Sequence, residues 1–103
     1  MSFHPVVPIL RSFDETKARE LYIDWLGFKV DWEHRFEPNT PLYMQVSRGA
    51  CVLHLSEHHG DGTPGTAIRI RVDELDQEWG AREMAVQDGS GNKLIFYRDL
   101  PAK

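Results

Sequence analysis

The chain has 103 residues, the usual size of one domain, and its 41% hydrophobic and 11% aromatic content is sufficient for a core. A net charge of −4 disfavours nucleic-acid binding, and no apolar run approaches the length of a membrane span, so we expect neither kind of partner. The single cysteine, Cys51, excludes an internal disulfide, and the N-terminus lacks a signal-peptide pattern; both features favour a cytoplasmic location.

The first predicted element is a short strand at residues 6–10, a β-branched apolar run with Pro8 inside it. Proline cannot donate to a β-ladder, so we expect this strand at a sheet edge or exchanged with a partner chain. Ser12 begins a sequence that fits a helix-capping box, and Asp14 is the alternative cap. The helix carries a buried stripe and ends at Gly27 in a left-handed conformation. The predicted stripe consists of Ala18, Leu21, Tyr22, Trp25 and Leu26.

Three strands are predicted after this helix. The first covers residues 28–36 and leads into a turn at 38–41. The other two, at 42–48 and 50–57, form a hairpin around Gly49. The order of the first half is therefore β-α-β-β-β.

The second half begins like the first. After a glycine-rich loop, residues 66–72 form a strand that reaches Asp73 as if a helix began there. The helix does not follow, because the chain passes from Asp76 directly into Trp79 and Gly80.

The rest of the second half is a hairpin of residues 82–87 and 93–98, joined by a loop with two glycines. We interpret the halves as a weak internal repeat within one domain, residues 1–103. The first module covers 1–59, and a shortened second module covers 66–99.

Three segments occur together in this chain: V-P-I-L at residues 7–10, W-L-G-F at 25–28 and the hairpin at 79–92. In this order they resemble the bleomycin-resistance protein family of the glyoxalase, or vicinal-oxygen-chelate, superfamily. The resemblance implies an α+β fold of paired β-α-β-β-β modules and a homodimer. Where relatives carry a helix and the start of a strand, roughly two to three dozen residues, this chain has nothing between Asp76 and Gln77. The second module therefore lacks its helix.

Enzymes of this superfamily bind a divalent metal with four side chains, one from each of four strands. By resemblance, these positions fall on Val7, His54, Ala67 and Ile95, and only His54 can ligate. One histidine cannot define a tetrahedral or octahedral site. We therefore expect no metal, no other cofactor and no catalytic residue. The alternative interpretation is a metal-dependent enzyme of the glyoxalase or dioxygenase type.

A second motif, H-x-x-E-H from His54 to His58, matches inverted zinc peptidases. That chemistry requires a helix, so that both histidines lie on one face. Here the segment ends a predicted strand, and Gly60 and Gly62 follow at once. The peptidase interpretation is therefore rejected.

The predicted ligand site lies on a concave sheet. Strand alternation places His54 and Ser56 on the face away from the helix. By resemblance, aromatic and polar positions line the cleft, where flat rings stack on a planar ligand and carboxylates attract a cation; Glu33 adds to this charge. The predicted ligand-binding residues are Asp31, Trp32, Phe36, His54, Ser56 and Trp79. Ordinary core packing is the alternative for the aromatic residues.

The resemblance thus implies a non-enzymatic binding protein. We expect it to sequester a small cationic or planar antibiotic, a bleomycin-like glycopeptide, and so confer resistance. Besides the metal-dependent enzyme, a second alternative is a ligand-free remnant that persists as a dimeric domain. The apparent deletion after Asp76 motivates this alternative, because an incomplete module leaves a sheet face uncovered.

Overall fold

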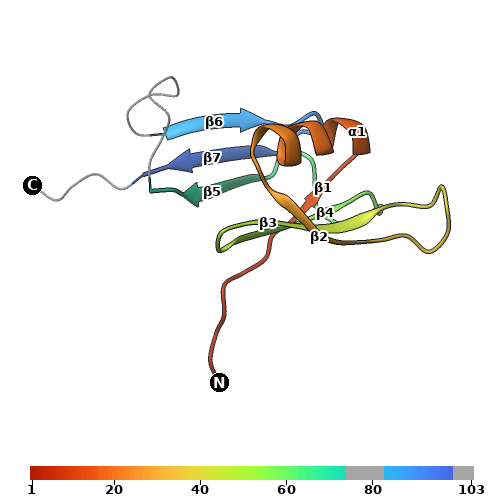
Figure 1. Cartoon of the computed structure of the whole chain (residues 1–103), viewed down its shortest axis with the longest axis horizontal. Helices are drawn as coiled ribbons and strands as arrows, with labels where there is room; N and C mark the ends of the chain where they lie inside the picture. Colours follow the sequence, from red (N-terminus) through yellow and green to blue (C-terminus); the bar gives the residue numbers. More distant parts are fainter. Residues whose placement is uncertain (74–82, 99–103) are drawn as a thin grey trace, which may run out of the picture.

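The computed structural model describes residues 1–73 and 83–98 of the chain (Figure 1). The predicted segment with Trp79 and Gly80, and the expected gap after Asp76, lie outside the described residues. In chain order the elements are β1 (Ile9–Arg11), α1 (Glu15–Ala18), the π-helix η1 (Arg19–Trp25), β2 (Lys29–His34), β3 (Tyr43–Arg48), β4 (Cys51–Ser56), β5 (Ala67–Arg71), β6 (Glu83–Gln87) and β7 (Lys93–Tyr97).

The described strands form two sheets that repeat one topology. The larger sheet has the order β1-β4-β3-β2, and the smaller has the order β5-β7-β6. In the larger sheet, β4 pairs in parallel with β1 and antiparallel with β3. In the smaller sheet, β7 pairs in parallel with β5 and antiparallel with β6. The smaller sheet therefore matches three of the four positions of the larger one, and no counterpart of β2 stands among its described strands. This confirms the predicted α+β fold with a shortened second module.

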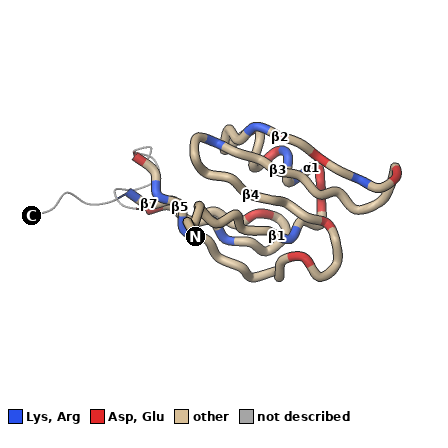
Figure 2. Tube along the Cα trace, turned by 90° about the horizontal axis from the view of Figure 1, so that it is seen from below, with Lys and Arg blue, Asp and Glu red and all other residues tan. Residues whose placement is uncertain are grey.

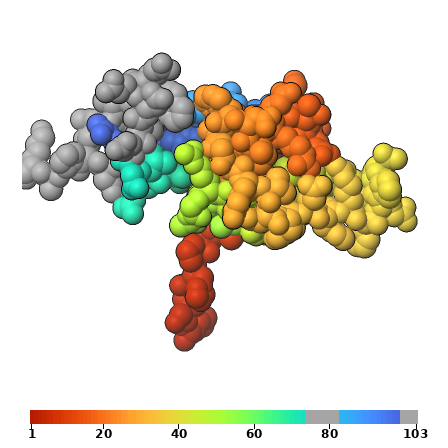
Figure 3. Space-filling model, in the orientation of Figure 1, coloured from red at the N-terminus to blue at the C-terminus, as the bar shows by residue number. Residues whose placement is uncertain are grey.

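β1 occupies the edge of the larger sheet, as the position of Pro8 predicted, but it begins later than expected. The predicted strand covered residues 6–10, whereas β1 spans Ile9–Arg11. The Pro8 carbonyl still accepts a hydrogen bond from the His54 amide. Residues 1–8 leave the domain on the side of the sheet away from the helices (Figure 1) and form a narrow projection (Figure 3).

The helix begins at the alternative cap. Asp14 is the N-cap, and its side chain accepts a hydrogen bond from the Lys17 amide, so the prediction of Ser12 was wrong. Ser12 is buried, and its amide donates to the Ser56 carbonyl, which extends the β1–β4 pairing.

The helical stripe needs a second correction, at Trp25. Ala18, Tyr22 and Leu26 are buried as predicted, but Trp25 is 54% exposed. From Arg19 the chain is π-helical, with wider turns than an α-helix, so the α-helical spacing no longer places Trp25 against the sheet. Gly27 ends the helix with a φ of 77°, as predicted.

A hydrophobic core of described residues joins the helix to both sheets. Leu10, Met44 and Leu53 pack beneath the helical residues, and Leu94 and Phe96 of β7 belong to the same cluster. Cys51 packs against this core, as predicted for its face of β4. Figure 1 shows the helical segment over the larger sheet and beside the smaller one.

A buried polar contact also links the modules. The Tyr22 hydroxyl donates to Asp88 Oδ2 at 2.7 Å. Asn92 donates to the same oxygen and to the carbonyl of Arg11 in β1. The loop that joins β6 to β7 is thereby fastened to the first module.

Candidate aromatic binding face

Three rings gather on the face of the larger sheet opposite the helix: Trp32 from β2, Tyr43 from β3 and His54 from β4. The rings of Trp32 and Tyr43 are stacked, with centroids 5.9 Å apart and planes 6° from parallel. His54 stands edge-on to both, with its centroid 5.3 Å from that of Trp32 and 5.2 Å from that of Tyr43. We call these three residues the aromatic cluster.

A β-bulge in β2 places two of the predicted ligand-binding side chains on this face. Val30 pairs with Val46, but the register then shifts, so that Trp32 pairs with Gln45 and Asp31 has no partner in the ladder. Successive residues of a regular strand point to opposite faces. Because of the extra residue, Asp31 and Trp32 both reach the face that carries Gln45.

Hydrogen bonds connect the cluster to the Asp31 carboxylate. The Tyr43 hydroxyl lies 2.6 Å from His54 Nδ1, and His54 Nε2 lies 2.9 Å from Gln45 Oε1. Gln45 Nε2 donates to Asp31 Oδ2 at 3.0 Å, and the Ser47 hydroxyl donates to Asp31 Oδ1 at 3.0 Å. We call these five residues the polar chain: Tyr43, His54, Gln45, Asp31 and Ser47.

Two pKa shifts define the charge of this face. Hydrogen bonds from Gln45, and then from Ser47, hold the pKa of Asp31 below its usual value. Partial burial, followed by the nearby Asp61 carboxylate, raises the pKa of Tyr43. At neutral pH the face therefore presents an ionised carboxylate and a protonated phenol beside exposed aromatic surface.

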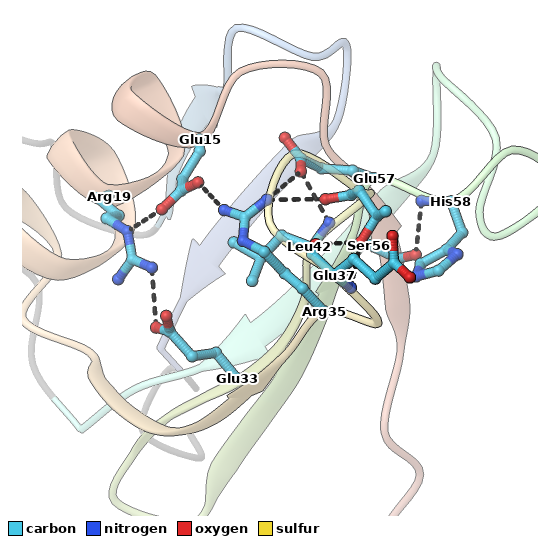
Figure 4. Close-up of polar contacts among 10 residues, drawn as sticks. Glu15, Arg19, Glu33, Arg35, Glu37, Leu42, Ser56, Glu57 and His58 are labelled. Atoms are coloured by element: carbon cyan, nitrogen blue, oxygen red, sulfur yellow. Dashed lines mark hydrogen bonds and ion pairs between the residues drawn. The ribbon is translucent and has the colours of Figure 1, made fainter.

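The neighbouring carboxylate of Glu33 lies on the opposite face of β2. In the strand ladder, Glu33 lies opposite Met44, a core residue. Its carboxylate accepts a hydrogen bond from Arg19 of the helix at 2.8 Å (Figure 4). Arg19 also bonds Glu15, which bonds Arg35 in turn, so this ion-pair network fastens β2 to the helix. Figure 2 shows basic and acidic residues interspersed along the chain. The charge predicted from Glu33 is therefore held away from the aromatic cluster.

The structure brings together three of the predicted ligand-binding residues, Asp31, Trp32 and His54. Phe36 lies beyond the end of β2, is 83% exposed and contacts the ring of His34 at a centroid distance of 5.4 Å. Ser56 is fully buried, and its hydroxyl donates to Asp61 and accepts from the His58 amide. Trp79 lies outside the described residues. The roles of all six residues in ligand binding stay predictions.

Sequence reasoning missed Tyr43, Gln45 and Ser47. A signal for them existed, because strand alternation places all three on one face of β3. The tight hairpin at Gly49 pairs Arg48 with Cys51, and counting back from there sets Gln45 opposite His54. The bulge at Asp31 had no comparable signal.

Among the residues that the structure describes, no group of three or more histidine, cysteine, aspartate or glutamate side chains is placed to hold a metal ion. No helix within 1–73 and 83–98 combines the length and apolar character needed to span a bilayer.

Comparison with known proteins supplies the family. A family model described as "Glyoxalase superfamily protein" matches residues 1–78. No curated protein gives a significant match to the chain.

Solved structures share the fold over nearly the whole chain. A bleomycin-binding protein from bleomycin-producing Streptomyces verticillus, solved with copper(II)-bleomycin, superposes with a TM-score of 0.71 at 25% identity, covering 97% of this chain and 99% of that one. An antibiotic-binding protein from Streptomyces sp. CB03234 gives 0.73 at 18% identity, with coverage of 97% and 99%. A superfamily member from Sphaerobacter thermophilus gives 0.67 at 16% identity, covering 95% and 98%.

Proposed function

Because this chain belongs to the glyoxalase superfamily, we propose that it is a non-enzymatic binding protein that sequesters a bleomycin-like glycopeptide or another planar cationic antibiotic, and so confers resistance. The observation that carries the proposal is the aromatic cluster beside the Asp31 carboxylate, on an accessible sheet face. The structural likeness to a protein solved with copper(II)-bleomycin supports the same ligand class.

The geometry of the aromatic cluster supports one position for a planar ligand. A ring inserted between Trp32 and Tyr43 would need two contacts of about 3.5 Å each, or about 7 Å in all, and their centroids lie only 5.9 Å apart. The ligand therefore packs against the solvent-facing edge of the stacked pair, where Trp32 is 44% exposed. A cationic group on the ligand then meets Asp31 next to that ring.

In this proposal, the protein acts in the cytoplasm as a homodimer. The N-terminal projection supports dimerisation, because Phe3 is 90% and Val6 is 88% exposed on a segment that projects from the domain (Figure 3). Large apolar side chains exposed in this way are typical of surfaces that a partner chain covers.

Isothermal titration with metal-free bleomycin at low salt tests this function. We expect saturable binding at about one ligand per chain, and a loss of roughly five- to hundredfold in affinity for Trp32→Ala, as for other ligand rings that pack on an aromatic side chain. Trp25→Phe is the matched control, because Trp25 lies on the helix at the opposite side of the sheet. It should bind like the wild type.

A flat titration of the wild-type protein would refute antibiotic capture. Affinity unchanged by Trp32→Ala, with binding retained, would remove the aromatic cluster from the site. Turnover of a substrate that depends on an added divalent metal would instead favour the enzyme alternative.

A further inference from the structure

The polar chain determines where its own protons lie. Asp31 is ionised at neutral pH and can only accept, so Gln45 must direct its Nε2 donor toward it. The amide group is planar, and the same orientation turns Gln45 Oε1 toward His54, 2.9 Å from Nε2. An amide oxygen only accepts, so the ring proton of His54 lies on Nε2.

This tautomer decides the direction of the Tyr43 hydroxyl. A neutral imidazole has one donor and one acceptor nitrogen, and with the proton on Nε2 the acceptor is Nδ1. Tyr43 therefore donates its one hydroxyl hydrogen to His54 across the 2.6 Å contact. The Tyr43 hydroxyl therefore offers an oxygen lone pair to a ligand that lies next to the ring of Trp32.

We propose that Asp31, acting through Gln45 and His54, sets Tyr43 as a hydrogen-bond acceptor and so selects planar ligands that carry an N–H donor at the ring edge. An isosteric ligand with an acceptor at that edge is disfavoured, because two lone pairs would face each other. The inference rests on the proposed function in taking this face as the ligand site. Gln45 is the positioning residue of the chain.

The geometry around Asp31 supplies a sharp test, because the two carboxylate oxygens have different partners. Oδ1 accepts from Ser47 at 3.0 Å and lies 3.7 Å from the Lys29 ammonium, so this position must stay an oxygen. Oδ2 accepts from Gln45. Asp31→Asn therefore places its new amide nitrogen at the Oδ2 position, facing Gln45.

The substitution reverses the donor and acceptor roles in each hydrogen bond of the polar chain from position 31 to Tyr43. Gln45 now accepts from Asn at position 31 with its Oε1 and turns its amide nitrogen toward His54. His54 must accept on Nε2, its proton moves to Nδ1, and Tyr43 becomes the acceptor inside the chain. The Tyr43 hydrogen is released toward the ligand, so the preference at the ring edge changes from donors to acceptors.

The first readout needs no ligand. Long-range nitrogen-15 NMR at pH 8, where an ordinary imidazole is neutral, reports which ring nitrogen of His54 carries the proton, and His54→Gln assigns the signal. We expect Nε2–H in the wild type and Nδ1–H in Asp31→Asn. Glu33→Gln, which removes the neighbouring carboxylate on the opposite face of β2, should leave Nε2–H in place. Nδ1–H in the wild type, or an unchanged tautomer in Asp31→Asn, would overturn the inference.

The second readout compares two neutral, isosteric probes, indole with an N–H donor and benzofuran with an oxygen acceptor, titrated by NMR. One neutral hydrogen bond corresponds to a factor of about three to ten, so we expect the wild type to prefer indole by that factor and Asp31→Asn to lose or reverse the preference. Tyr43→Phe keeps the ring and should bind the two probes equally, which preserves the test if Asp31→Asn does not fold. Equal affinities in the wild type would overturn the inference.

The two proposals fail separately. If bleomycin does not bind but the indole preference and the tautomers are as expected, antibiotic capture is wrong and the selection of donor edges stands. If bleomycin binds but the His54 tautomer does not respond to Asp31→Asn, the function stands and the polar chain does not set specificity.

Discussion

Tyr22→Phe tests the contact that joins the two modules. The substitution keeps the ring, which is 1% exposed and packs edge-on against Phe28, and it removes one hydrogen bond of 2.7 Å to the Asp88 carboxylate. Asp88 retains its bonds from the amides of Ser90 and Asn92 and from the Asn92 side chain. A buried hydrogen bond to a charged group contributes about 1.5–3 kcal/mol, and with three donors remaining we expect a loss of about 2 kcal/mol.

Urea unfolding followed by circular dichroism measures this loss. For a domain of this size, 2 kcal/mol corresponds to a fall of roughly 1–2 M in the urea midpoint with an unchanged slope. Protein concentration must be held constant, because dimerisation would contribute to the apparent stability. Tyr43→Phe is the matched control: it removes a neutral, partly exposed bond to His54, and we expect a loss below about 1 kcal/mol.

The pH dependence provides an independent check. Burial, followed by the hydrogen bond to Asp88, raises the pKa of Tyr22 in the folded protein. An unfolded tyrosine loses its proton near pH 10, so the contribution of Tyr22 is fully present below about pH 10 and is lost as the pH rises above it. The wild type and Tyr22→Phe should therefore converge in stability above pH 10. A Tyr22→Phe protein within about 0.5 kcal/mol of the wild type at pH 7 would refute the reasoning.

Two further predictions concern the backbone and the ion pairs. Gly62→Ala should lower the free energy of unfolding by at least about 1 kcal/mol more than Gly60→Ala in thermal melts. Both glycines have positive φ, but only at Gly62 would a Cβ lie 2.8 Å from a backbone nitrogen, that of Arg11; equal losses would contradict this. Arg35→Gln should cost about 0.5–1 kcal/mol at low salt and less in 1 M NaCl, because its ion pairs are partly exposed. A loss independent of salt would show that packing rather than charge is responsible.

The elements of this fold follow from local signals in the sequence. Glycines with positive φ mark the helix end at Gly27 and the hairpin at Gly49, where the structure has them. Alternation along β4 separates Leu53 and Leu55, which are buried in the core, from His54. Such signals act between residues close in the chain, so they can be read without knowing the rest of the molecule.

The candidate site depended on the tertiary structure to a greater degree. Alternation could place Gln45 and His54 on one face, but the bulge that adds Asp31 to that face arises in the pairing of β2 with β3. The π-helical turns that expose Trp25 have no local pattern either. The loop that covers Ser56 is held by Asp61.

The sequence by itself determined the family, the repeated topology and the face of the sheet that carries His54, because these depend on periodicity and turn residues. Only the tertiary structure decided which side chains meet there: the stacking of Trp32 on Tyr43 and the bonds that run from Tyr43 to Asp31. The physical reason is that a hydrogen bond or a ring contact requires atoms placed to within a few tenths of an ångström. That placement comes from the register and the bulge between strands, which no single strand encodes.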